Sequence, residues 1–131
     1  MLNKNAFKNN NVVVTGGAGG IGSATCELFL KYSATVYLVD KDLEKIKKIK
    51  KDLNHPNLKI YNFDITKEKE VKNFYKKIQD KKLNVNHLIN NAGVATLNLC
   101  KDLSVKEWDL VMNVNLKGMF FLCLLFHADK Y

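Results

Sequence analysis

Five glycines in eight residues, the stretch TGGAGGIG from Thr15 to Gly22, constrain the fold of this chain more than any other feature. The stretch follows a short β-branched run, Val12 to Val14, which is typical of a buried strand. A chain that leaves a strand, turns tightly and at once begins a helix close to the sheet favours residues without a Cβ atom. The glycines therefore predict a strand, a tight turn and a helix in immediate succession.

The glycine spacing fits two templates at once. Read as G-x-G-x-x-G, the glycines are Gly17, Gly19 and Gly22; read as T-G-x-x-x-G-x-G, they are Gly16, Gly20 and Gly22. These residues alone leave both registers open. In either register the N-terminus of the helix would offer free N–H groups and a positive dipole end to a phosphate.

A helix and a second strand are expected after the glycine turn. The helix spans about Ile21 to Tyr32, with Ala24, Leu28 and Phe29 on its apolar face. The strand spans Ala34 to Asp40, where ATVYLVD is rich in apolar and β-branched residues and ends in an acid. Strand, glycine turn, helix, strand and acid is the order that a dinucleotide-binding unit requires.

The acid at the end of the second strand bears on the choice of cofactor. Asp40 lies 18 residues past Gly22, close to the spacing at which a carboxylate accepts hydrogen bonds from an adenosine ribose. A carboxylate there would repel a 2′-phosphate, although Lys41 could soften the repulsion. Because the glycine turn carries no basic side chain, we expect NAD(H) to be preferred over NADP(H).

The remaining sequence continues the alternation of strands and helices. Further strands are expected at Leu58 to Asp64 and at Asn86 to Asn90. The last helical region opens with a capping box of Ser104 and Glu107 and runs toward the chain end, with a break near Gly118. Such alternation predicts an α/β fold, a Rossmann-type doubly wound parallel sheet of about four strands with helices on both faces. Residues 1–131 are expected to form one domain.

Charge and cysteine content bear on the other function classes. All 21 basic residues are lysines and the net charge is +8, but a nucleic-acid binder would be expected to use arginine and interleaved aromatic residues. The run Lys45 to Lys51 is interpreted as the solvated face of an amphipathic helix, with a polyanion-binding patch as the lesser alternative. Three scattered cysteines without C-x-x-C spacing indicate reduced thiols and no metal site.

Membrane association is not expected either. A signal peptide is not visible, and the apolar run Met119 to Phe126, with eight residues, is too short to cross a bilayer. We therefore expect a cytoplasmic protein.

Four motifs in sequence order resemble the N-terminal half of a short-chain dehydrogenase/reductase of the single-domain branch. They are TGGAGGIG, FDIT, NNAG and NVNLKG, and they cover about residues 10–127. The family's form T-G-x-x-x-G-I-G places Gly16, Gly20 and Gly22 in the motif, with Gly17 and Gly19 as fillers. The family also implies the strand order 3-2-1-4 and an incomplete sheet.

The resemblance implies roles for individual residues. Alignment on N-L-x-G makes Asn115, and not Asn113, the family's catalytic asparagine. Cofactor contacts are implied for ten residues: Gly16, Gly20, Ile21, Gly22, Asp40, Asp64, Ile65, Asn91, Ala92 and Gly93.

The resemblance further implies hydride transfer between a nicotinamide cofactor and an alcohol or ketone substrate. The family's serine and Tyr-x-x-x-Lys pair follow the asparagine segment, and Tyr131 is reached before them. The one literal Tyr-x-x-x-Lys, from Tyr37 to Lys41, would lie beside the adenosine. The chain is therefore expected to hold the cofactor-binding half and to be inactive by itself; the alternative is a noncatalytic module that binds NAD or a partner.

Two further expectations concern packing. The final helix is apolar on nearly all sides, which predicts a homo-oligomer formed through this helix. Ser33 stands where the family often has glycine after the first helix, so a modest left-handed backbone strain is expected there.

Overall fold

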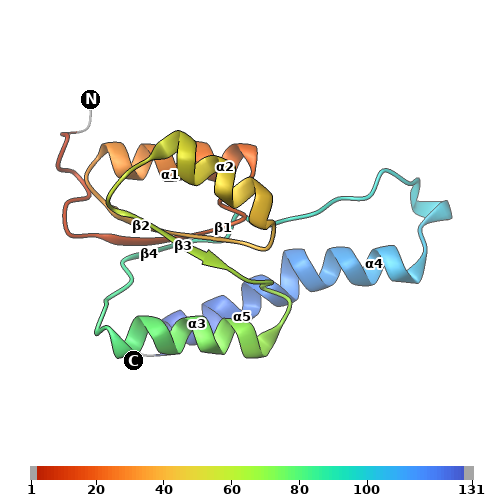
Figure 1. Cartoon of the computed structure of the whole chain (residues 1–131). Helices are drawn as coiled ribbons and strands as arrows, with labels where there is room; N and C mark the ends of the chain where they lie inside the picture. Colours follow the sequence, from red (N-terminus) through yellow and green to blue (C-terminus); the bar gives the residue numbers. More distant parts are fainter. Residues whose placement is uncertain (1–2, 129–131) are drawn as a thin grey trace.

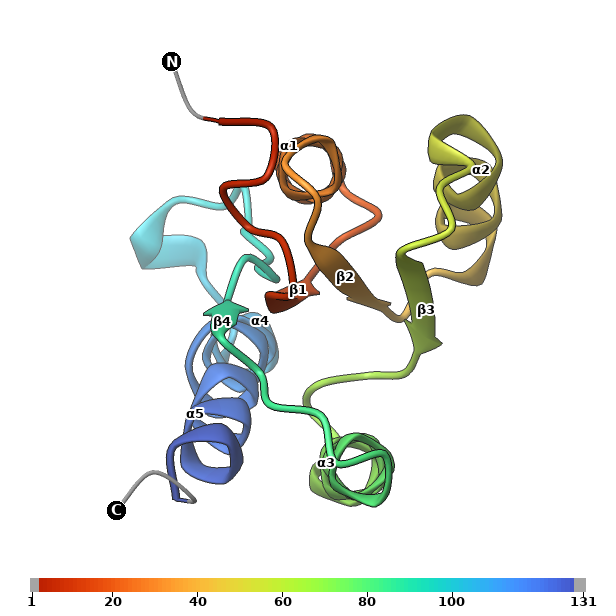
Figure 2. The same ribbon diagram turned by 90° about the vertical axis from the view of Figure 1, so that its left-hand side faces the viewer.

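The computed structural model describes residues 3–128, so Tyr131 lies outside the described residues. Its centre is a parallel sheet of four strands in the order β3-β2-β1-β4, which confirms the predicted fold class and strand order (Figure 2). The strands are β1 (Asn11–Thr15), β2 (Thr35–Asp40), β3 (Leu58–Asn62) and β4 (His87–Ile89).

Helices cover both faces of the sheet, as predicted. In Figure 2, α1 and α2 lie on one side of the strands, whereas α3 and α5 lie on the other. The helices are α1 (Gly20–Lys31), α2 (Leu43–Leu53), α3 (Glu68–Asp80), α4 (Val105–Met112) and α5 (Met119–Ala128), with a short 3₁₀ turn at Cys100–Asp102.

Two hydrophobic cores follow from the alternation of side chains along β1. Val12 and Val14 point toward α1 and α2, where Ile46 of α2 joins them. Val13 points to the opposite face, into a core that includes Phe74 of α3 and Leu122 of α5. Successive residues of a strand face opposite sides of a sheet, so a continuous apolar run such as VVV suits a strand covered by helices on both faces.

The residues that follow α1 and precede α4 adopt the conformations predicted from the sequence. Ser33 has a φ angle of 71°, which confirms the expected left-handed conformation after α1. The capping box is also present: the Ser104 side chain accepts from the Glu107 N–H, and the Glu107 carboxylate accepts from the Ser104 N–H. The Ser104 hydroxyl also donates to the Glu107 carboxylate, and this bond, together with the one from the Ser104 N–H, lowers the pKa of Glu107.

The expected break near Gly118 is wrong. A π-helical segment, Asn113–Gly118, joins α4 to α5, and Figure 1 shows a helical ribbon that is not interrupted between them. The joined helix Val105–Phe126 has 22 residues, and a window of 18 residues within it has a mean hydropathy of 1.5, so the helix is long and apolar enough to cross a membrane by length and composition alone. Core helices of soluble proteins can have the same length and hydropathy. The expectation that the apolar segment is too short to cross a bilayer, which counted only the eight residues Met119 to Phe126, is nevertheless not supported.

Candidate functional site

A cleft of about 530 Å³ opens at the carboxyl ends of the strands. Ligands of open α/β sheets bind at this edge, where the loops after the strands meet. All ten residues predicted to contact the cofactor line this one cleft: Gly16, Gly20, Ile21, Gly22, Asp40, Asp64, Ile65, Asn91, Ala92 and Gly93. The fold thus brings together loops that follow β1, β2, β3 and β4.

The glycine turn is shaped by several close approaches of the backbone. Gly16 has a φ angle of +61°, a conformation that glycine adopts without strain. A Cβ atom on Gly22 would lie 2.1 Å from the Gly16 carbonyl oxygen, so α1 can begin this close to the turn only with glycine there. A Cβ atom on Gly20, in contrast, would have no described heavy atom within 4 Å beyond its chain neighbours and its own helix backbone.

Gly17 is not a filler. A Cβ atom on Gly17 would lie 2.5 Å from the Cγ atom of Leu38, a fully buried residue of β2. The prediction that Gly17 only fills space between motif positions is therefore wrong, because the turn packs against β2 at this residue. Gly19, with its nearest contact at 3.3 Å, has more room.

Thr15 and Asn91 fasten the glycine turn to the end of β4. The buried Thr15 hydroxyl donates to the Ile89 carbonyl at 3.3 Å and accepts from the N–H groups of Asn91 and Ala92, both at 3.1 Å. The Asn91 side-chain amide donates to the carbonyl oxygens of Thr15 and Gly16 at 3.0 and 3.1 Å. Asn91 thereby sets the spacing between two walls of the cleft.

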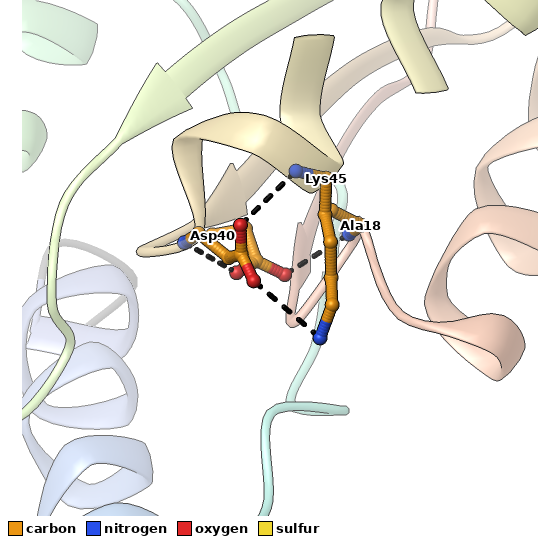
Figure 3. Close-up of polar contacts among 4 residues, drawn as sticks. Ala18, Asp40 and Lys45 are labelled. Atoms are coloured by element: carbon orange, nitrogen blue, oxygen red, sulfur yellow. Dashed lines mark hydrogen bonds and ion pairs between the residues drawn. The ribbon is translucent and has the colours of Figure 1, made fainter. Parts of the chain in front are cut away.

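Asp40 connects the end of β2 to the glycine turn (Figure 3). Its Oδ2 atom accepts from the Ala18 N–H at 3.0 Å, and its Oδ1 atom accepts from the Asp42 N–H, also at 3.0 Å. Asp40 is half-buried at the rim of the cleft. Each carboxylate oxygen keeps a second lone pair, so both remain able to accept from a ligand hydroxyl.

Asp64 and Ile65 form the wall of the cleft beyond β3. The Asp64 Oδ1 atom accepts from the N–H and the hydroxyl of Thr66, at 2.9 and 2.8 Å, which holds this loop in a tight turn. Ile65 is buried and packs against the π-helical segment at Gly118. The loop therefore contacts both the cleft and the C-terminal helix.

Asn115 lies beside the cleft rather than in its lining. It belongs to the π-helical segment, and its side chain hydrogen-bonds the backbone of Val94, a residue that does line the cleft. The Asn113 side chain makes no hydrogen bond with the residues that the structure describes. The two asparagines, equivalent in the motif NVN, thus have different surroundings.

Tyr37 is placed in the core. Only 4% of its surface is exposed, its hydroxyl donates to Asn11 Oδ1 at 3.4 Å, and burial raises its pKa. A tyrosine that transfers protons near neutral pH needs a lowered pKa and access to substrate. Tyr37 has neither, in agreement with its exclusion as a catalytic residue.

Sequence reasoning missed several residues of the lining. Asp42 and Lys45 carry charges at the rim, and their signal was an Asp three residues before a Lys at the start of a helix, which is an N-cap pattern. The apolar members of the lining had no distinguishing signal, since apolar residues are common throughout the chain: Val39, Phe63, Val94 and Val114.

The parallel sheet, the glycine turn and the acid at the rim define the class of protein as an α/β nucleotide-binding fold of the Rossmann type. Residues 10–129 match the short chain dehydrogenase family, and the chain belongs to that family of oxidoreductases.

Two of the relatives have names that state an activity. The NAD-dependent glycerol dehydrogenase of Listeria innocua is 37% identical over 110 residues, which are 84% of this chain and 43% of the relative. The 3-oxoacyl-(acyl-carrier-protein) reductase of Thermotoga maritima is 34% identical over 110 residues, 82% of this chain and 45% of the relative. The chain therefore spans less than half the length of these relatives.

Solved structures agree with the fold. A short-chain dehydrogenase from Leptospira borgpetersenii with bound NAD⁺ is 29% identical with a TM-score of 0.88, covering 98% of this chain and 49% of that one. A short-chain dehydrogenase from Novosphingobium aromaticivorans is 25% identical, also with a TM-score of 0.88, and the match covers 95% of this chain and 46% of that one.

Proposed function

We propose that this chain forms the cofactor-binding part of an NAD-dependent oxidoreductase that acts on an alcohol or ketone substrate. The observation that carries the proposal is the convergence of the ten predicted residues on one cleft at the carboxyl edge of the sheet. Bound NAD would supply the hydride acceptor or donor. The protein residues described here would bind and orient it.

The glycine turn fits the pyrophosphate of a dinucleotide. The first turn of α1 has no side-chain cap and no acidic residue, so its N–H groups are available to an anion. The open space around Gly20, at the same helix start, leaves room for a phosphate to approach the backbone. Both features agree with the proposed role.

Asp40 supports the preference for NAD(H). Its carboxylate would accept hydrogen bonds from the ribose hydroxyls and would repel a 2′-phosphate. The variant Asp40→Ala should weaken NADH binding by about tenfold and NADPH binding by less. Asp40 also accepts a hydrogen bond from the Ala18 N–H, so its removal would make the glycine turn less ordered and would weaken binding of both cofactors. The ratio of the two affinities is therefore the informative quantity. An equal loss of affinity for NADH and NADPH would contradict the proposal that Asp40 binds the ribose.

We infer that the 131-residue chain alone binds the dinucleotide without turnover. Of the family's catalytic residues, the sequence has Asn115, and its one Tyr-x-x-x-Lys runs from Tyr37, which is buried in β2, to Lys41, which is exposed just past the end of β2. The alternative function, a noncatalytic module that binds NAD or a partner, would share the cleft. Alcohol oxidation with NAD by the purified chain would refute the inferred inactivity if this activity persisted in both the Tyr37→Phe and the Asn115→Ala variants.

Binding itself can be tested at Gly20. Fluorescence or calorimetric titration with NADH is expected to give saturable binding, and Gly20→Val should abolish it while the thermal unfolding curve stays within a few degrees. A Cβ atom at Gly20 would have no described heavy atom within 4 Å beyond its chain neighbours and its own helix backbone, so a loss of binding with an unchanged unfolding curve would report the ligand and not the fold. Unchanged binding in Gly20→Val would contradict a dinucleotide at this turn.

We also propose a cytoplasmic homo-oligomer formed through the C-terminal helix, without nucleic-acid or membrane partners. Support comes from large apolar side chains on this helix that are about half exposed: Trp108, Leu110, Leu116, Phe120 and Leu124. Sedimentation equilibrium should give a mass above 14.9 kDa, and Phe120→Lys with Leu124→Lys should reduce it toward that value. If the protein instead co-sedimented with vesicles of neutral lipid, the result would indicate that the helix enters membranes.

A further inference from the structure

A groove of about 640 Å³ follows the outer edge of β3. Among the described residues β3 pairs with β2 alone, and Figure 2 shows it at the edge of the sheet, with α2 on one face and α3 on the other. The lining includes Ile60 and Asn62 of β3 and Asn73 and Lys77 of α3. We call this feature the β3 groove.

The backbone of β3 has unpaired hydrogen-bonding groups in the β3 groove. The Asn57 carbonyl accepts from β2 at 2.9 Å and the Phe63 N–H donates to β2 at 3.1 Å, so the odd-numbered residues face the sheet. Alternate residues of a strand direct their N–H and C=O groups to opposite edges, so those of Ile60 and Asn62 point outward. These outward groups have no hydrogen bond to another described residue.

We infer that the β3 groove binds an extended, acidic segment of a partner protein, which joins the sheet as a further strand. Main-chain hydrogen bonds to an exposed sheet edge are a recurring mode of peptide recognition. Ile60 and Asn62 together offer two N–H and two C=O groups for such bonds. The inference goes beyond the proposed function, because it does not require a dinucleotide in the cofactor cleft.

Lysine side chains along the β3 groove favour an acidic segment. Lys41 and Lys77 line the groove, and neither forms a hydrogen bond or an ion pair with another described residue. The ammonium group of Lys81 lies 3.4 Å from the hydroxyl of Tyr61, which also lines the groove. Ion pairs between exposed groups contribute little energy each, so they would select the partner while the main-chain bonds hold it.

The two carboxylates of the lining already have partners in the loop after β3. Glu70 Oε2 accepts from the Asp64 N–H at 2.8 Å, and Asp64 Oδ1 accepts from the N–H and hydroxyl of Thr66 at 2.9 and 2.8 Å. These donors partly compensate the negative charges. The uncompensated charges of the groove are therefore those of its lysines.

A second copy of this chain is a less suitable occupant than an acidic partner. Pairing of two β3 edges would bring the lysines of both grooves together, and like charges on opposing strands are destabilising. The net charge of +8 opposes such an approach further. An exposed lysine in an edge strand, such as Lys59, is also a known means of preventing self-pairing.

The test titrates the isotope-labelled full chain, at low salt, with a capped peptide in which glutamate and valine alternate. The amide resonances of Ile60 and Asn62 should shift saturably, with a Kd below about 1 mM. The same peptide with N-methyl groups on two adjacent central residues lacks central donors on both edges and should bind at least about tenfold more weakly. A peptide with glutamine in place of glutamate should bind roughly three- to fivefold more weakly.

A matched pair of variants on α3 tests the charge contact. Lys77→Glu should weaken binding of the acidic peptide about three- to fivefold. Lys76→Glu makes the same change of charge at the preceding residue, which is also exposed but does not line the groove, and should alter the affinity less than about twofold.

Each measurement has an outcome that would overturn the inference. Strand addition is excluded if Ile60 and Asn62 do not shift, or if the N-methylated peptide binds as well as its parent. The preference for an acidic partner is excluded if the glutamine peptide binds equally well. Equal losses in Lys76→Glu and Lys77→Glu would show a general effect of charge and no contact in the β3 groove.

Discussion

Asn115 satisfies both backbone polar groups of Val94. Its Oδ1 atom accepts from the Val94 N–H at 2.8 Å, and its Nδ2 atom donates to the Val94 carbonyl at 2.9 Å. Through this pair of bonds the π-helical segment is fixed to the loop that follows β4, on the rim of the cleft. The asparagine that the family places in catalysis therefore also joins two parts of the fold.

The variant Asn115→Ala should lower the free energy of unfolding by about 1 kcal/mol, because both backbone groups of Val94 lose a protein partner near a partly exposed surface. Urea denaturation measures this difference. Asn113→Ala is the matched control on the same segment and should stay within about 0.5 kcal/mol of the wild type. Equal destabilisation by the two variants would show that the hydrogen bonds between Asn115 and Val94 make no specific contribution to the free energy of unfolding.

Two glycines of the same turn should respond oppositely to alanine. Gly17→Ala places a methyl group against the buried Leu38 side chain and should cost about 1–3 kcal/mol in unfolding free energy. Gly20→Ala meets open space at the start of α1 and should be neutral or slightly stabilising. Thermal unfolding of the two variants, followed by circular dichroism, tests the contrast. The reverse order of stabilities would contradict the packing of the turn against β2.

Gly118 should be energetically coupled to Ile65. A Cβ atom on Gly118 would lie 2.7 Å and 2.8 Å from the Cδ1 and Cγ1 atoms of Ile65, so Gly118→Ala should cost about 1–3 kcal/mol. Adding Gly118→Ala to an Ile65→Ala background removes the collision and should cost at least about 1 kcal/mol less than in the wild type. A double-mutant cycle in urea provides the measurement, and additivity within about 0.5 kcal/mol would rule out the direct contact.

Cys26 should be protected from thiol reagents. Burial raises the pKa of its thiol from an ordinary 9.0 to about 12, whereas Cys100 is exposed. At pH 8 a disulfide reagent should label Cys100 rapidly and Cys26 only after unfolding, which peptide mass spectrometry can assign. Rapid labelling of Cys26 in the native protein would mean that α1 does not pack as described.

The same thiol makes stability depend on alkaline pH. In the unfolded chain Cys26 releases its proton near pH 9, but in the folded chain it holds the proton until about pH 12. Its contribution to stability is therefore complete below pH 9 and is lost as the pH rises from 9 toward 12. Cys26→Ala should flatten this part of the curve of unfolding free energy against pH. An unchanged slope would assign the pH dependence to other groups.

Prediction from sequence worked where neighbouring residues decide the outcome. The β-branched run before the glycines, the capping box of Ser104 and Glu107, and the left-handed Ser33 are all local, and all are present. It failed for the buried face of α1. Ala24 and Leu28 of the expected stripe are exposed, and only Phe29 packs against the core, whereas Gly22, Cys26 and Leu30 are buried.

The reason for that failure is a contact between parts of the turn. Gly22 sits against the Gly16 carbonyl, which fixes the rotation of α1 about its axis, and periodicity carries no information on such a contact. Gly17 was misjudged for the same reason, since its neighbour Leu38 is 21 residues away in the sequence. Gly118 likewise lies against its distant neighbour Ile65, which leaves no room for a Cβ atom at this position of the helix.

The sequence by itself determined the order of strands and helices, the glycine turn and the identity of ten of the residues that gather at the cleft. Backbone preference and hydrophobic pattern act over a few residues, and the family motifs supplied the order of the sheet. Only the tertiary structure decided which glycines are packed and which is open, which asparagine fixes Val94, and that Lys45 reaches the rim beside Asp40. These outcomes depend on distances between elements, because side chains far apart in sequence must approach within a few ångströms before their chemistry can combine.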